Sequence, residues 1–392
     1  MMIRLLPRKI TLPAAKWRDN VGWVSSLFAG DVARAECSSA ADKAHARQAG
    51  CLSYIVLPPR RCFSRMRALK KVAGCLLLWV VILTAFARAE EKSDRASVFI
   101  AVGAGGEGHY ADTFAKWAAH WQRACDEGGA KSVTIGFDKD AKDAPSDHDR
   151  LKAALDAEPK DGANELWIVL LGHGTADAKD AKFNLRGDDL AASELAAWLK
   201  PFKRTTIVVC AFSSSGAWLK PLAGPDRVVI TATKNGSENN YARFGGHLAQ
   251  AIGDPSADID KDGETSLLEA WLTAARKTAD FYKDEGRIAT EHSLLDDNAD
   301  GLGTPPDWFS GVRIVKKSRD GSAPDGLRAA QIHLVRSAAE RALTAGQRAG
   351  RDTLERELAA LREHKSAMKE DDYFRELEAL MLKLARIYSG GS

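Results

Sequence analysis

Between residues 97 and 233, short continuous aliphatic runs alternate with longer amphipathic segments. The aliphatic runs lack the in-out alternation of surface strands, which is typical of central strands in a parallel sheet that is covered on both faces. These strands are expected at 97–103, 132–138, 165–172, 204–212 and 227–233. Helices are expected between them at 111–127, 146–159 and 191–202. The pattern predicts an α/β fold, with a mostly parallel sheet and helices on both of its faces.

A different pattern follows the last of these strands. Two more helices are expected at 241–252 and 267–284, and a linker rich in Pro, Gly and Asp then covers 303–326. Residues 327–390 are rich in Ala, Arg, Glu and Leu, with apolar residues at helical spacing on both sides of a break near 364–372. This composition predicts an α-helical C-terminal appendage. Because no heptad pattern persists, its apolar positions are expected to be ordinary packing faces and not a coiled coil. The appendage is expected to pack on the domain or to bind a protein.

The first 89 residues have the features of a targeting segment. Residues 66–89 contain basic side chains, an apolar stretch and a small-residue site, which is typical of a secretory signal peptide cleaved near Ala89. Residues 1–65 precede this signal and are expected to be an over-extended, non-structural N-terminus. The apolar stretch is shorter than the about 20 residues of a membrane span. We therefore expect a secreted or periplasmic protein, with membrane contact only through an uncleaved signal, and a main domain at 90–302.

Removing the signal reverses the charge of the chain. The whole sequence has a formal net charge of +3, whereas residues 90–392 carry 41 Lys and Arg against 49 Asp and Glu, a net charge of −8. This balance argues against nucleic acid as a partner, which would require a basic face. Only Cys125 and Cys210 remain of the six cysteines, so the domain is not a disulfide scaffold.

A glycine-rich stretch follows the first expected strand. "GAGGEG" at 103–108 has the spacing of a dinucleotide-binding turn, which also requires an acidic residue at the end of the second strand, about 20 positions later. The nearest match at that strand end, Asp138, lies about 30 residues past Gly108. We therefore expect a simple turn at the carboxyl edge of the sheet.

Candidate catalytic residues follow two of the buried strands. "LLGHGT" places His173 and Gly174 after the strand 165–172, and "VVCAFSSSG" places Cys210 and Ser213 at the end of the strand 204–212. The carboxyl ends of parallel strands meet at one edge of a sheet, where open α/β folds carry their reactive groups. A thiolate there needs a histidine as acid and base and a backbone N–H to hold the oxyanion.

These residues resemble the caspase-like peptidases, and most closely the legumain family. The resemblance rests on "LLGHGT" and on "TATKNGSENNYARF" at 231–244, and it covers roughly residues 97–255. It implies a Cys/His dyad endopeptidase acting on a protein or peptide substrate, with His173 as general acid and base and the Gly174 N–H at the oxyanion. It also implies a primary substrate pocket lined by Glu238, Asn239 and Asn240.

The position of the nucleophile remains open between two residues. In the family the nucleophile precedes a Ser-Gly pair by two positions, and this rule selects Ser213, whereas the nearby thiol belongs to Cys210. Free cysteine is also a common core residue, and a serine in this position needs an oriented strong base. The sequence thus predicts an exported, calcium-stabilised cysteine endopeptidase or, alternatively, a catalytically inactive caspase-like module that binds calcium and a partner.

The prediction of calcium binding rests on an acidic loop. "DIDKDGETSLLE" at 258–269 matches the EF-hand-like pattern DxDxDGx5E at each ligand position. The expected ligands are the side chains of Asp258, Asp260, Asp262, Ser266 and Glu269 and the carbonyl of Glu264.

A weaker copy of this loop lies further along the chain. "DDNADGLGTPPD" at 296–307 repeats the first half of the pattern, with Asp296, Asn298 and Asp300 as candidate ligands. Its twelfth position is Asp307, a shorter carboxylate behind two prolines, so a plain turn is the alternative here.

Overall fold

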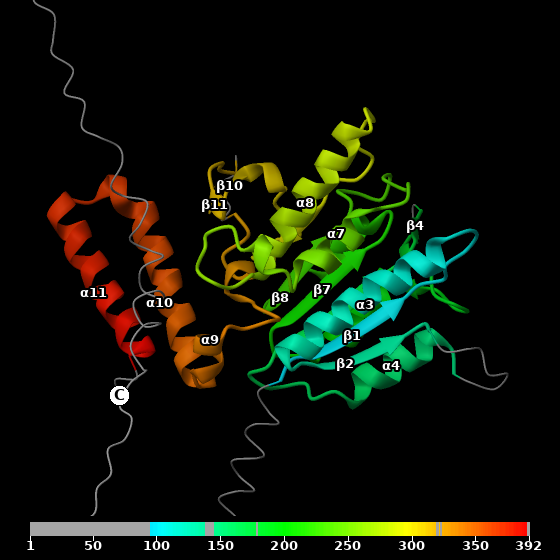
Figure 1. The fold of residues 1–392 in the computed structure, drawn as a ribbon, viewed down its shortest axis with the longest axis horizontal. Helices are drawn as coiled ribbons and strands as arrows, with labels where there is room; N and C mark the ends of the chain where they lie inside the picture. Colours follow the sequence, from blue (N-terminus) through cyan, green and yellow to red (C-terminus); the bar gives the residue numbers. More distant parts are fainter. Residues whose placement is uncertain (1–94, 138–144, 178, 319–320, 322–323, 390–392) are drawn as a thin grey trace, which may run out of the picture. The chain divides into compact units, whose positions relative to one another are not determined.

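A six-stranded sheet forms the centre of the protein (Figure 1), as seen in a computed structural model that describes residues 95–137, 145–177, 179–318, 321 and 324–389. The strand order is β2-β1-β3-β7-β8-β9, and the first five strands are parallel while β9 runs antiparallel to β8. The strands are β1 (Ser97–Val102), β2 (Lys131–Ile135), β3 (Leu166–Leu171), β7 (Thr206–Ala211), β8 (Arg227–Thr231) and β9 (Leu294–Asp296).

Helices cover both faces of this sheet. One face packs against α3 (Tyr110–Gly128), α7 (Phe244–Ala251) and α8 (Leu267–Asp284), and these helices lie together in Figure 1. The other face packs against α4 (Asp147–Ala157), α5 (Ala192–Leu199) and α6 (Leu219–Leu222). The predicted α/β fold is thereby confirmed.

The alternation of side chains along β7 assigns its residues to the two faces. Ile207, Val209 and Ala211 belong to the apolar cluster beneath α3, α7 and α8, whereas Val208 and Cys210 belong to the cluster on the α4 side. The register of β3 against β7 pairs Leu171 with Ala211. The segments that follow these two strands, which contain His173 and Ser213, therefore leave the sheet at the same edge.

Two small sheets accompany the main one. The first joins β4 (Gly174–Ala176), β5 (Ala181–Phe183) and β6 (Leu190–Ala191), and the second is the antiparallel pair β10 (Phe309–Ser310) and β11 (Arg313–Ile314). The pair β10 and β11 lies in the range expected to be a linker. Its strands are too short and too polar to be found by hydrophobic periodicity.

The C-terminal appendage is helical, as predicted. It contains α9 (Ala338–Ala342), α10 (Ala345–His364) and α11 (Glu370–Tyr388). A capping box of Thr344 and Gln347 begins α10, and α10 and α11 pack against each other, with Leu361 and Leu384 among their buried side chains. The turn between α10 and α11 falls within the expected break at 364–372.

The expected N-terminal segments, 1–65 and 66–89, lie outside the described residues. Within the part of the chain that the structure describes, none of the helices has both the length and the apolar composition of a membrane span.

Candidate functional site

The carboxyl edge of the sheet brings Ser213 to the segment that carries His173. The Ser213 hydroxyl donates to the Gly174 carbonyl at 3.0 Å and accepts from the Gly174 N–H at 3.2 Å. The serine is 3 % exposed. Gly174 allows this close approach, because a Cβ on it would lie 2.4 Å from a ring carbon of Phe212. The predicted oxyanion donor therefore already has a partner within the protein.

Cys210, the other candidate nucleophile, lies on the α4 side of the sheet, away from the helix α3 that His173 contacts. Its side chain is fully buried in the apolar cluster on the α4 side, and burial raises the pKa of its thiol. The His173 ring instead contacts Tyr110 and Phe114 of α3, with ring centroids 4.8 and 5.1 Å away. Because the strand continues regularly through residue 210, the pleat turns the thiol away from His173, and this geometry does not favour a pair of Cys210 and His173.

The surroundings of His173 are aromatic. Burial lowers the pKa of its imidazole, so the neutral ring is favoured. Tyr241 lies 6.1 Å from the ring of His173, between centroids, and 4.9 Å from that of Tyr110. Among the described residues, the other cysteine is Cys125, which is buried in the opposite cluster and has a pKa raised to about 12 by burial and by Asp126. The edge therefore has a histidine but no thiol in the described residues.

The residues expected to line a substrate pocket have different environments. Glu238 accepts hydrogen bonds from the backbone N–H groups of Lys234 and His292 and pairs with the His292 ring. Asn239 and Asn240 are exposed. Glu238 therefore holds its loop against the segment after α8, and only the two asparagines remain at the surface.

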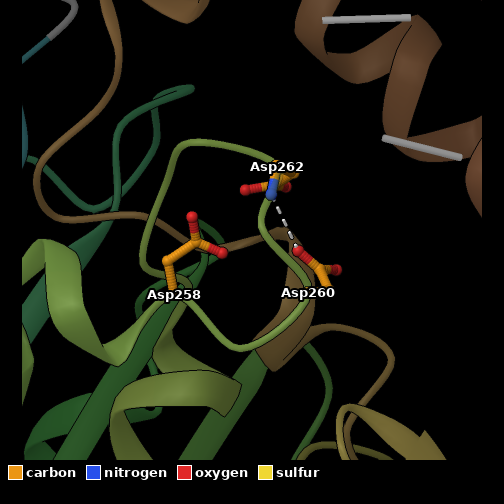
Figure 2. A group of neighbouring side chains, drawn as sticks. All are labelled: Asp258, Asp260 and Asp262. Atoms are coloured by element: carbon orange, nitrogen blue, oxygen red, sulfur yellow. Dashed lines mark hydrogen bonds between the residues drawn. The ribbon is translucent and has the colours of Figure 1, made fainter. Parts of the chain in front are cut away.

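The first acidic loop brings its carboxylates together. One carboxylate oxygen each from Asp258, Asp260 and Asp262 lie within 4.8 Å of one another, and Figure 2 shows the three side chains around the loop. Asp258 accepts hydrogen bonds from the N–H groups of Lys261 at 2.6 Å and Gly263 at 3.1 Å. Lys261 and Gly263 have φ angles of +65° and +96°. The positive φ at the sixth loop position is the reason for a glycine there.

Glu269, at the twelfth position, closes this first loop through hydrogen bonds. Its Oε1 accepts from the N–H groups of Ile259 at 2.7 Å and Asp260 at 3.2 Å. Its Oε2 accepts from the N–H and hydroxyl of Ser266, which caps α8. The Glu264 side chain instead points to the Ser337 N–H, which leaves the Glu264 carbonyl as the predicted ligand atom.

The second acidic loop has the same backbone hydrogen bonds as the first. Asp296 accepts from the N–H groups of Ala299 at 3.0 Å and Gly301 at 2.6 Å, as Asp258 does at the equivalent positions. Asn298 and Asp300 each accept from the N–H two residues ahead, as Asp260 and Asp262 do. The φ angles of Ala299 and Gly301 are +72° and +70°. The two loops therefore share one geometry.

Asp325 takes the place of the twelfth residue in the second loop. Its Oδ1 accepts from the N–H groups of Asp297 at 2.8 Å and Asn298 at 3.1 Å, and its Oδ2 accepts from the Thr304 hydroxyl at 2.7 Å. These donors stand at the same loop positions as the donors to Glu269. Asp307, at the twelfth position in sequence, is exposed and pairs with Lys316. No local motif marks Asp325, so sequence reasoning missed it.

Burial and neighbouring carboxylates raise the pKa of an acidic side chain in each loop. Desolvation and the neighbouring Asp260 carboxylate raise the pKa of Asp262 to about 7. Burial, followed by the charges of Asp297 and Asp296, raises the pKa of Asp325 to about 7. Carboxylate, amide and carbonyl oxygens are the ligands of hard cations, and calcium accepts six to eight of them. The oxygen donors present therefore fit calcium.

Comparison with known proteins gives limited information. No family model and no curated protein matches the chain. Among solved structures, the Drosophila initiator caspase Dronc is similar with a TM-score of 0.35 and 13 % identity, over 54 % of this chain and 82 % of that one. A protein of Geobacter sulfurreducens is similar with a TM-score of 0.34 and 14 % identity, over 54 % of this chain and 98 % of that one. Similarity at this level carries no information about activity.

Proposed function

We propose that the protein is a calcium-binding module on a caspase-like α/β fold, exported from the cell and without thiol peptidase activity. The observation that carries this proposal is the common hydrogen-bond pattern of the two acidic loops, in which Asp325 makes the bonds of Glu269. A simple turn needs no carboxylate from outside its own residues. A distant carboxylate that completes the second loop is expected if the complete ring of oxygen atoms binds an ion.

The calcium ligands would come from both loops. In the first they would be the side chains of Asp258, Asp260, Asp262, Ser266 and Glu269 with the Glu264 carbonyl, and in the second Asp296, Asn298, Asp300 and Asp325. A bound calcium ion would offset the repulsion between these clustered, negatively charged carboxylates. A signal peptide at 66–89 would deliver the protein to a compartment where calcium is abundant, which supports calcium over magnesium.

The positions of the two described cysteines support the proposed lack of thiol chemistry. Both are buried, and the pKa of each thiol is raised, so neither offers a thiolate near neutral pH. The Ser213 hydroxyl, at the position that the family rule selects, is occupied by the backbone of Gly174. A serine nucleophile needs an oriented base, whereas the His173 ring packs against the aromatic rings of Tyr110, Phe114 and Tyr241.

Isothermal titration with calcium tests this function. We expect two ions per chain for the wild type, one for Asp258→Ala and one for Asp296→Ala. Equal heats for wild type and Asp258→Ala would reject calcium binding at the first loop. A library of fluorogenic peptides should show no hydrolysis in calcium. Hydrolysis that is lost in Ser213→Ala or Cys210→Ala would reject the non-catalytic assignment.

A further inference from the structure

Residues Asp325–Ser337, here called the connector, lead from the second acidic loop to the helical appendage. The structure holds this segment by carboxylates that belong to both acidic loops. The appendage begins directly after it, with α9. The connector therefore lies between the proposed calcium sites and α9, α10 and α11.

The second loop binds the start of the connector in two ways. Asp325, the first connector residue, itself makes the closing hydrogen bonds of that loop. In return Asp297 accepts from three connector N–H groups, those of Gly326 at 3.0 Å and of Arg328 and Ala329 at 2.9 Å. Asp297 stands at the second loop position, which supplies no ligand to a cation in this type of loop.

The first loop binds the end of the connector. The Glu264 carboxylate accepts from the Ser337 N–H and lies 4.0 Å from the Nε2 of His333. One residue beyond the Ser266 cap, the Leu267 N–H donates to the Ile332 carbonyl at 2.8 Å. Both ends of the connector are thus fixed by residues within or next to an acidic loop.

Apolar packing holds only one side of the connector. Ala329, Ile332 and Leu334 are buried in the cluster beneath α8. The other side borders a cavity of about 660 Å³ whose lining includes His333 and Arg336 of the connector and Arg351 of α10. On that side the loop carboxylates act together with the ion pairs of Arg328 with Asp226 and of Arg336 with Glu165, and of these only the loop carboxylates link the connector to the proposed calcium sites.

We propose that calcium binding at the two loops and docking of the connector are coupled, so that calcium fixes the helical appendage and its loss releases the appendage. The inference rests on the proposed function and adds its regulation. Asp325 can complete the second site only while the connector is docked. A ligand that binds the docked state alone stabilises that state, and docking strengthens calcium binding by the same factor.

Hydrogen exchange of the full chain, read by mass spectrometry in chelator and in calcium, tests the coupling. The amides of Gly326, Arg328, Ala329 and Ser337 report docking, because their acceptors are Asp297 and Glu264. At a calcium concentration of 100 times Kd, their exchange should slow by about 100-fold if opening abolishes binding at one site. Calcium uptake is measured on the same samples by titration.

Asp297→Asn separates docking from binding. It removes the charge that holds three connector amides but no proposed ligand, so the variant should still take up two ions while its connector amides exchange faster than those of wild type in calcium. Asp307→Asn, in the same loop but exposed, is the matched control and should behave as wild type. Circular dichroism confirms that both variants fold.

The outcomes distinguish the two proposals. Absence of calcium uptake by wild type would reject the proposed function together with the coupling. Uptake of two ions without any slowing of connector exchange would overturn the coupling and leave calcium binding intact. Slowing in wild type that persists unchanged in Asp297→Asn would also overturn the assigned role of Asp297.

Discussion

The Ser213 hydroxyl is hydrogen-bonded to both the N–H and the carbonyl of Gly174, the residue that follows His173. It thereby joins the segments that leave β3 and β7 at the carboxyl edge of the sheet. The side chain at the alternative nucleophile position thus connects two strand ends.

Replacing Ser213 should therefore lower stability. In Ser213→Ala the buried N–H and carbonyl of Gly174 both lose their hydroxyl partner, so the free energy of unfolding should fall by about 1–3 kcal/mol. Urea unfolding followed by circular dichroism measures this difference. Ser237→Ala, at an exposed serine, should change it by less than about 0.5 kcal/mol. An unchanged midpoint for Ser213→Ala would mean that the two hydrogen bonds contribute nothing net.

The thiols of Cys125 and Cys210 should be inert to iodoacetamide in the native protein. Burial raises the pKa of both above the ordinary value, so the reactive thiolate is scarce, and raising the pH from 7 to 9 should not restore labelling. Both should react after unfolding in urea. Peptide mapping separates them from the four cysteines at 37–75. If Cys210 in the native protein were labelled, with a half-maximal rate below pH 9, its thiol would be accessible and the prediction would be wrong.

Asp325 and Asp307 should differ sharply in their effect on calcium binding. Asp325→Asn replaces the carboxylate that closes the second loop with a neutral amide, so the number of bound ions should fall from two to one. Asp307→Asn changes an exposed side chain paired with Lys316 and should leave two ions bound. Titration calorimetry of the two variants shows which residue closes the second loop: Asp325, which lies against the loop in the fold, or Asp307, which is twelfth in the sequence. A loss of one ion in Asp307→Asn would restore the sequence-based assignment.

Glu291 should be important for the loop that precedes α7. Its buried carboxylate accepts from the N–H groups of Arg243 and Phe244 and from the Tyr282 hydroxyl. Glu291→Ala should lower the free energy of unfolding by about 2–3 kcal/mol, because it leaves these donors without an acceptor. Glu285→Ala, at an exposed position after α8, is the control for urea unfolding. Equal midpoints for the two variants would show that solvent replaces the carboxylate fully.

The sequence predicted the main elements because their patterns are local. Continuous aliphatic runs identified the five parallel strands, and helical spacing identified the two long C-terminal helices. The antiparallel strand β9 was missed, because Leu294–Asp296 is only three residues long and its last residue, Asp296, is also the first residue of the second acidic loop. The face on which Cys210 lies depended on how far β7 continues, and the strand pattern alone left this open.

Side chains that act across long sequence distances were harder to predict. The first acidic loop is complete within residues 258–269, so its pattern contains both ends of the site. The second loop draws its closing carboxylate from Asp325, and only the folded chain shows that Asp325 lies against Asn298. Similarly, Glu238 was expected in a pocket, but its pairing with His292 depends on the path of the chain after α8.

The different origins of the two closing carboxylates also set an order of assembly. The first loop is complete as soon as Glu269 leaves the ribosome, whereas the second must wait for Asp325, after β10 and β11. The entropy lost on closing a loop grows with its length, so the second closure is the more costly one. A chain truncated before Asp325 would keep the first ring of oxygen donors and lack the second. The second loop can therefore close only after the chain has been synthesised as far as Asp325, shortly before the helical appendage begins.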